Sequence, residues 1–354
     1  MTKILPYTFG VEIECFGVPI PVVTWALGKA GVSVADLCSP RPANGTALDV
    51  YNQAASGRYG ETTWVISGDG SIRGNYPMEI KSPILKGPEG LKTLRKVVGI
   101  LRHVGLKVNE STGLHVHVGV KNAPGEHSHN VRTVLEILKR YESFTADIDS
   151  LVRADRRGTA NTYCRPVKAR RVQLEGILGN VEDAVEPLPD GYNDWSSVRR
   201  EEYRRYGFGD FYWESDNRQH LIAEPLSARR RAGLTAVTPT MDNVHQYGHH
   251  YDACSIASLG KYGTIEFRQH QGSMDPTEIV NWVLFVVNHV EQARLAVTKQ
   301  GQTKTRGRKP GLFTGLPMHV RTHFKKQIAK FGPQPPRAVV PRGGQPTQGL
   351  PPAV

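Results

Sequence analysis

Hydrophobic and polar residues alternate along three short segments of the chain, which predicts three β-strands. The alternation runs over residues 7–16, 112–120 and 263–270. In an extended strand, successive side chains point to opposite faces of the sheet. Each segment therefore has one apolar face that can pack on helices and one face made of polar side chains.

Helices and further strands are predicted between these segments. Apolar residues recur at three- and four-residue steps over residues 88–103, which is typical of an amphipathic helix. Further helices are expected over residues 21–30, 130–148 and 275–297, and further strands over residues 63–66 and 78–83. Asp275 is suited to cap the last of these helices, with Pro276 at its first position. The body of the chain thus alternates strands and helices.

Two regions depart from this pattern. Residues 165–235 are rich in Arg, Glu, Tyr and Gly, and we interpret them as an insertion or an elaborated loop region, with a short helix near residues 197–206. Residues 299–354 are rich in Gly, Pro, Gln and Lys, and are expected to be largely disordered apart from a short helix over residues 318–331. We therefore predict a body over residues 1–298 and a separate tail.

Composition narrows the class of protein. The 354 residues are 39% hydrophobic and 22% charged, an ordinary mixture for a globular core. No apolar run reaches the roughly 18 residues of a membrane span, and the first residues lack the apolar core of a secretory signal. The four cysteines form no C-x-x-C pair, which argues against a disulfide scaffold or a thiolate zinc site. A cytoplasmic location is the expectation.

The net charge of +12 comes almost entirely from the tail. Residues 299–354 hold eleven Lys or Arg and no acid, while the other 34 basic residues nearly balance the 33 acidic ones. Residues 304–311 resemble an AT-hook, although Lys309 stands where proline normally follows the second arginine. A solvated extension with weak, non-specific affinity for nucleic acid is the simpler interpretation, and a nucleic-acid-binding protein stays an alternative.

The polar faces of the three alternating strands carry groups that bind metals and phosphate. These residues are Glu12 and Glu14, His115 and His117, and Glu266, Arg268 and His270. One such strand alone is typical of a solvated sheet face or a cross-strand ion pair. If the three faces converge, however, the carboxylates and an imidazole suit Mg²⁺ or Mn²⁺, and the guanidinium suits a phosphate oxygen. Together they indicate phosphoryl transfer from a nucleotide.

Five linked motifs follow one another in the chain. They are FGVEIE at residues 9–14, DGS at 69–71, EIKSP at 79–83, TGLHVHV at 112–118 and GTIEFR at 263–268. In this order they resemble the putative amidoligase family, carboxylate–amine ligases of the glutamine synthetase and glutamate–cysteine ligase superfamily. The resemblance covers about residues 7–298, and residues 157–164 are similar to the family's central Arg/Asn/Tyr-Cys element. It implies an α+β fold, a curved antiparallel sheet or partial barrel backed by helices, as in glutamine synthetase.

The resemblance also implies roles for single residues. Metal ligands for Mg²⁺ or Mn²⁺ at two neighbouring sites would be Glu12, Glu14, Glu79, His115 and Glu266. Catalytic residues would be Arg268, Glu79 and His117, with Arg268 stabilising the transferred phosphoryl group. Contacts to ATP would come from Arg268, Arg157, Asn161 and Tyr163. The histidines at positions 245, 249 and 250 are interpreted as part of a surface loop.

The chemistry implied by the resemblance is amide formation. ATP would phosphorylate a carboxylate to an acyl phosphate, and an amine would then displace the phosphate. The partners would be a small-molecule or peptide carboxylate and an amine. No membrane partner is expected. A guanidino or other small-molecule kinase on the same scaffold is the nearest alternative.

Overall fold

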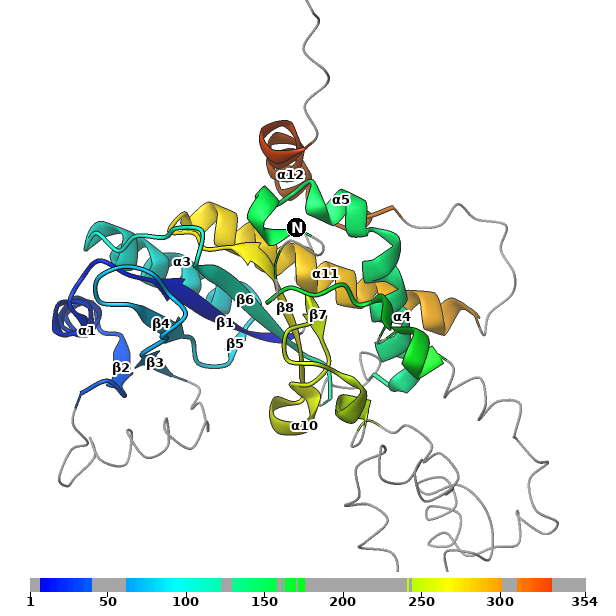
Figure 1. The fold of residues 1–354 in the computed structure, drawn as a ribbon, viewed down its shortest axis with the longest axis horizontal. Coiled ribbons are helices and arrows are strands. Elements are labelled where there is room, and N and C mark those ends of the chain that lie inside the picture. The colour runs from blue at the N-terminus through cyan, green and yellow to red at the C-terminus, as the bar shows by residue number, and fades with distance from the viewer. Residues whose placement is uncertain are drawn as a thin grey trace, which may run out of the picture.

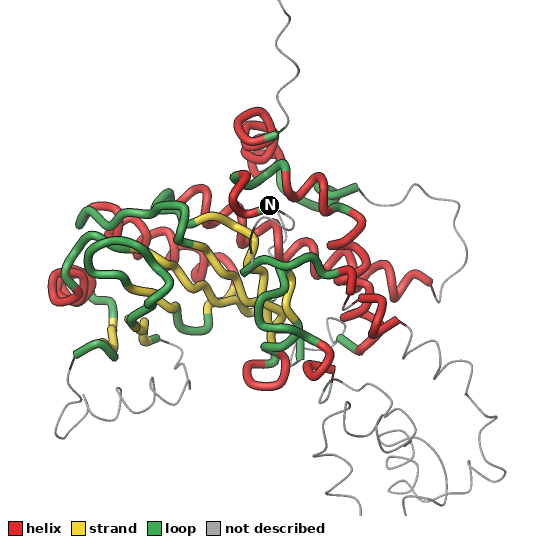
Figure 2. The backbone as a smooth tube through the Cα atoms, viewed as in Figure 1, coloured by secondary structure: helices red, strands yellow, loops and turns green. Residues whose placement is uncertain are grey.

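An open, mostly antiparallel sheet lies at the centre of the computed structural model, with helices packed against it (Figures 1 and 2). The structure describes residues 7–39, 62–121, 129–157, 161, 163–169, 171–175, 241, 244–300 and 311–332. Within these residues the strands are β1 (Thr8–Cys15), β2 (Ser33–Asp36), β3 (Thr63–Ser67), β4 (Met78–Lys81), β5 (Leu85–Lys86), β6 (Gly113–Gly119), β7 (Cys254–Ser255) and β8 (Thr264–Gln271). Their order is β2-β3-β4-β1-β6-β8-β7, and β5 pairs with β1. The predicted mixture of helices and a mostly antiparallel sheet is confirmed.

The helices are those expected from the sequence, together with several short ones. They are α1 (Ile20–Lys29), α3 (Gly87–His103), α4 (Val131–Ser143), α5 (Thr145–Asp149), α10 (Leu259–Tyr262), α11 (Pro276–Gln300) and α12 (Met318–Phe331), with 3-10 turns η2 (Ala154–Arg156) and η6 (Val244–Tyr247). Asp275 accepts a hydrogen bond from the backbone N–H of Thr277 at 2.8 Å, as expected of a cap. Across the described residues, no helix combines the length and the apolar character needed to cross a membrane.

The central strands divide their side chains as the alternation predicts. Val11, Ile13 and Cys15 of β1 are buried in the hydrophobic core, together with Leu114 and Val116 of β6. Helix α11 packs against β6 and also contacts α3 and α4, so it is the main cover of this apolar face (Figure 1). The opposite face of β1 and β6 is therefore left for polar side chains.

The helix predicted over residues 130–148 is interrupted at Phe144, which separates α4 from α5. The hydroxyls of Ser143 and Thr145 bond to the backbone oxygens of Arg140 and Tyr141, at 2.9 and 3.3 Å. Such side-chain bonds compete with the backbone hydrogen bonds of a helix. The apolar spacing continues through the break, so the pattern alone does not reveal it.

Strand β8 contains one residue more than the segment of β6 with which it pairs. Leu114 pairs with His270, but Val116 pairs with Phe267, so the register shifts between them. An extra residue of this kind is a β-bulge, and it reverses the alternation beyond it. His270 consequently lies among helices, with its ring centroid 4.7 Å from that of Trp282. The prediction that His270 shares a face with Glu266 and Arg268 is wrong.

Part of the predicted tail belongs to the packed body. Leu312, Leu316, Val320 and Phe324 are buried, and the ring of Phe324 lies 5.2 Å from that of Phe285 on α11. The helix expected over residues 318–331 is present as α12, but it packs against α11 and so extends the body beyond residue 298. The AT-hook-like residues 304–310, the helix expected near 197–206 and most of the 165–235 insertion lie outside the described residues.

Candidate functional site

The polar sides of β1, β4, β6 and β8 meet in one cavity of about 720 Å³. Its lining includes seven residues singled out from the sequence: Glu12, Glu14, Glu79, His115, His117, Glu266 and Arg268. They converge because β1 lies between β4 and β6 in antiparallel register, with Glu12 opposite both Lys81 and His115. Side chains opposite each other on one face of such a pair are close enough to interact.

Glu12 is the centre of the cluster. Its carboxylate oxygens lie 3.3 Å from His115 Nδ1, 3.6 Å from His117 Nε2 and 3.7 Å from Lys81 Nζ. Burial alone would raise the pKa of Glu12, but the neighbouring imidazoles of His115 and His117 outweigh burial and hold the pKa well below its usual range. Glu12 is therefore a carboxylate rather than an acid at neutral pH.

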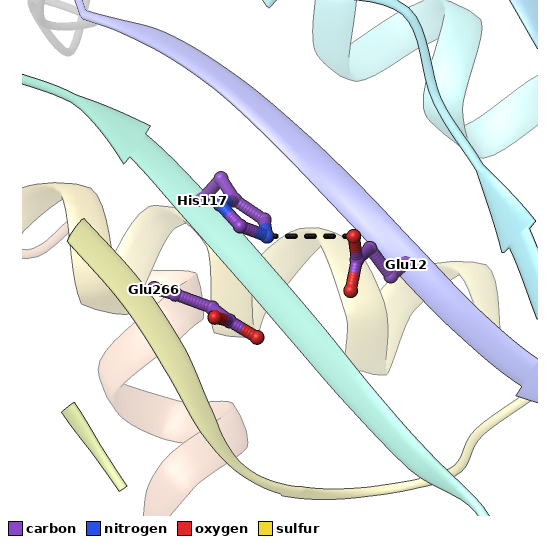
Figure 3. Close-up of side chains that lie close together, drawn as sticks. All are labelled: Glu12, His117 and Glu266. Carbon is purple, nitrogen blue, oxygen red and sulfur yellow. Dashed lines mark ion pairs between the residues drawn. The ribbon is translucent and has the colours of Figure 1, made fainter. Parts of the chain in front are cut away.

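A first triad of ligand atoms is formed by Glu12, His117 and Glu266, whose atoms lie within 4.8 Å of one another. Figure 3 shows His117 on β6 and Glu12 on β1 pointing toward each other, with Glu266 beside them. His117 Nε2 is buried and has no hydrogen-bond partner, while Nδ1 lies 3.0 Å from Thr264 Oγ1. An imidazole oriented through one nitrogen, with the other facing a carboxylate but making no hydrogen bond, is suited to bind a metal ion. These residues fit a divalent cation.

A second triad is formed by Glu12, Glu79 and His115, and it shares Glu12 with the first. Burial raises the pKa of Glu79 to about 8, and the charge of Glu12 adds to this effect. Lys81 partly offsets it, because its Nζ lies 2.7 Å from Glu79 Oε2. This triad therefore already contains a cation supplied by the chain.

Glu14 is held by its neighbours and belongs to neither triad. Its Oε2 accepts a hydrogen bond from the backbone N–H of Gly113 at 2.6 Å, and its Oε1 lies 3.4 Å from His115 Nε2. A Cβ at Gly113 would lie 2.9 Å from Arg156 Nη2 and 3.1 Å from His115 Nε2, so a larger residue here would displace these side chains. Glu14 thus orients His115.

Arg268 lies beside the first triad. Its guanidinium pairs with Glu266, and its Nε lies 3.5 Å from the backbone oxygen of Tyr163. Burial would raise the pKa of Glu266, but the charges of His117 and Arg268 keep it low. Arg156 donates to the backbone oxygen of Arg268 at 2.6 Å, which fixes this part of β8. A buried guanidinium beside a triad of ligand atoms can bind a phosphoryl oxygen.

The residues expected to contact ATP are divided by the structure. Asn161 and Tyr163 line the cavity with Arg268, but Arg157 does not. The guanidinium of Arg157 instead donates to the backbone oxygens of Val152 and Phe331, which ties η2 to the end of α12. Arg157 therefore does not line the cavity with the other residues expected to contact ATP, and the arginine from this segment that does is Arg156.

Several cavity residues were missed. They are His250, Tyr251, Ser258 and Tyr262, which come from the segment before β8. Ser258 Oγ lies 3.2 Å from Glu266 Oε2, and the rings of Tyr163 and Tyr251 meet edge to face at 5.2 Å. His250 is exposed and lies in a turn, as expected of a surface loop, and it also contributes to the cavity wall. The sequence of this segment has no long periodic pattern of apolar residues. Its contact with β8 therefore could not be predicted from the local sequence.

Asp69 and Ser71 line the same cavity from the loop after β3. Asp69 Oδ1 accepts hydrogen bonds from the backbone N–H and the hydroxyl of Ser71, at 2.8 and 2.7 Å. This motif therefore forms a tight turn and also faces the site.

Comparison with known families gives one result. A family described as a putative amidoligase enzyme matches residues 5–290. The matched range contains every strand that contributes to the cavity. A comparison with curated proteins found no match.

Proposed function

The chain belongs to the putative amidoligase family, and we propose that it is an ATP-dependent carboxylate–amine ligase. The proposed reaction forms an amide through an acyl phosphate, from a carboxylate and an amine carried by small molecules or peptides. We further propose that the open sheet is the glutamine synthetase-like scaffold of the superfamily. One observation carries this proposal: the guanidinium of Arg268 lies beside the triad of Glu12, His117 and Glu266 in a single cavity.

The first triad would hold Mg²⁺ or Mn²⁺. Two carboxylates and one imidazole are suitable ligands for these ions, and the buried His117 Nε2, which makes no hydrogen bond, supports this choice. A bound divalent ion would neutralise negative charge on the transferring phosphoryl group. His115 and Glu14, expected to be ligands, act in this proposal as the pair that positions Glu12.

The side chains around the triad have distinct tasks. Arg268 donates to an oxygen of the transferring phosphoryl group and so stabilises the charge that develops there. Arg156 keeps Arg268 in place through its backbone oxygen. Glu79, across from Glu14 on β4, is suited to accept the proton that the attacking amine releases.

Nucleotide binding is assigned to the wall opposite β4. Tyr163 is 47% exposed and pairs with Tyr251, so the two rings offer an aromatic surface for a base. Asn161 Oδ1 accepts a hydrogen bond from the backbone N–H of Tyr163 at 2.8 Å, which anchors the backbone that carries this ring. Arg268 Nε lies 3.5 Å from the backbone oxygen of Tyr163, so its guanidinium would be within reach of the phosphates of a nucleotide bound here.

The experiment is a measurement of ADP release from ATP and Mg²⁺. One arm contains a mixture of the twenty common amino acids with hydroxylamine as the amine, a second contains arginine and creatine as guanidino acceptors, and a third contains neither. The ligase proposal expects ADP release that needs both the acid and hydroxylamine. Release with the guanidino acceptors alone would instead identify a kinase, and release independent of any acceptor would contradict both.

A further inference from the structure

Lys81 brings a positive charge of the chain's own into the cavity. It lies on β4 directly opposite Glu12 of β1, and two residues from Glu79 on the same face of the strand. Its Nζ is 2.7 Å from Glu79 Oε2 and 3.7 Å from Glu12 Oε1. The lysine side chain is 23% exposed, so the ammonium group is mostly enclosed by the site.

The two triads differ in what their ligand atoms already contact. In the first, His117 Nε2 makes no hydrogen bond and faces one carboxylate, that of Glu12, at 3.6 Å. In the second, both ring nitrogens of His115 face carboxylates, Nδ1 at 3.3 Å from Glu12 and Nε2 at 3.4 Å from Glu14. The two carboxylates of the second triad both lie against the Lys81 ammonium. One ammonium thus contacts both carboxylates of the second triad, whereas in the first triad Arg268 pairs with Glu266 alone.

A divalent ion at the second triad would compete with this ammonium for the same carboxylate oxygens. If both were present, two cations would lie a few ångströms apart and repel each other strongly in a partly buried site. The ammonium also has the advantage of being tethered, because a group held by the strand has no translational freedom left to lose on binding. Its backbone position is fixed by the pairing of β4 with β1.

We propose that Lys81 is a built-in cation that takes the place of a second metal ion. The protein then binds one divalent ion, at Glu12, His117 and Glu266, and the second triad of Glu12, Glu79 and His115 is neutralised by the lysine. The identity of the metal rests on the proposed function, whereas the position of Lys81 does not. One consequence is that Glu79 stays free of metal and faces the cavity, where an amine substrate can reach it.

The test counts Mn²⁺ ions bound by the intact chain in the absence of nucleotide. The loss of the free Mn²⁺ signal in electron paramagnetic resonance gives the number bound, and a spin-coupled spectrum identifies two neighbouring ions. We expect one Mn²⁺ for the wild-type chain and for Lys81→Arg, which retains a cation. Lys81→Met, which removes the charge at similar size, should bind two ions and give the coupled spectrum.

Lys92→Met is the matched control, because Lys92 on α3 is 79% exposed and pairs only weakly, at 3.6 Å, with Glu89. It should bind one Mn²⁺. Thermal unfolding provides a second measurement: without metal, Lys81→Met should unfold at a lower temperature than wild type, and Mn²⁺ should raise its midpoint by more than it raises that of wild type.

Two ions bound to the wild-type chain, or one ion bound to Lys81→Met with no larger thermal shift, would overturn the role of Lys81 while leaving the first metal site and the proposed ligase intact. No Mn²⁺ bound to either chain, with or without ATP, would overturn both.

Discussion

Thr264 orients the imidazole of His117, a ligand residue of the first triad. Its hydroxyl lies 3.0 Å from His117 Nδ1, on the side of the ring away from Glu12. Partners of this kind typically contribute a factor of about 10 to 100 in metal affinity. We predict that Thr264→Val lowers Mn²⁺ affinity at least about tenfold in a calorimetric titration, with little change in thermal stability.

Thr277→Val is the matched control, because Thr277 is exposed at the start of α11 and is not among the residues that line the cavity. It should bind Mn²⁺ like wild type. If Thr264→Val also kept wild-type affinity, His117 would not depend on this hydroxyl, and its assignment as a ligand would lose its main support.

Arg268 offers a second test at the residue scale. Arg268→Lys keeps the positive charge but loses the planar two-point contact with a phosphoryl oxygen. Because that contact strengthens mainly in the transition state, turnover should fall by about two to four decades while ATP affinity changes much less. Equal, small losses in both quantities would mean that Arg268 only pairs with Glu266.

Residue types and their alternation predict which side chains face the same cavity. They do not predict which hydrogen bonds and ion pairs these side chains form there. Glu12, His115 and Glu266 were expected on converging faces, and all three line the cavity. The ammonium of Lys81 was not foreseen, because its role depends on strand pairing across β1. The contacts of Arg157 were also unpredictable, since its acceptor at Phe331 lies 174 residues away.

At the scale of elements, strand β8 shows the limit of periodicity. A period of two correctly places Glu266 and Arg268 on the site face, but one extra residue turns His270 toward the helices. The pattern contains no sign of the bulge, because a polar residue suits either face. The same limit explains the break between α4 and α5, where the apolar spacing continues although the helix ends.

Helix α11 contains a buried histidine that should make the fold sensitive to acid. His289 lies among Tyr141, Phe267 and Phe285, and burial lowers its pKa to about 3. An unfolded histidine titrates near pH 6.5, so between these values the unfolded chain binds a proton that the folded chain does not. Stability should therefore fall as the pH drops below about 6.5.

The contribution of His289 is about 2 kcal/mol at pH 5, from about 1.4 kcal/mol for each unit of pH. We predict that His289→Gln, which can still donate to the backbone oxygen of Ile137, loses less stability between pH 7 and pH 5 than wild type does. Urea unfolding at the two pH values measures the difference. Equal losses for the two proteins would contradict the neutral, buried state of His289.

At the scale of the whole molecule, the body is larger than the sequence pattern indicated. Apolar side chains of residues 311–331 complete the core beside α11, with Phe324 packed between Trp282, Phe285 and Phe313. A short amphipathic helix at the end of a basic, Pro- and Gly-rich region is easily interpreted as part of a tail. Only the folded structure shows that this helix, α12, packs against α11.

This packing predicts two different outcomes for changes at the C-terminal end. Phe324→Ala should lower the free energy of unfolding by about 3–5 kcal/mol, because it leaves a cavity beneath α12. Removal of residues 333–354 should leave both stability and ADP release unchanged, since it spares every described contact of α12. The exposed neighbour Lys325→Ala is the control for the first change. An unaffected Phe324→Ala variant would mean that α12 is a separate tail after all.

The central claim is that the cavity activates a carboxylate by phosphorylation, and the fate of one oxygen atom tests it most directly. In an acyl phosphate, the bridging oxygen comes from the carboxylate, and it leaves with phosphate when the amine attacks the acyl carbon. The intact chain is supplied with ATP, Mg²⁺, hydroxylamine and a mixture of amino acids labelled with ¹⁸O in their carboxylates. Mass spectrometry of the inorganic phosphate should find one ¹⁸O per molecule released. Phosphate formed without ¹⁸O would contradict the account.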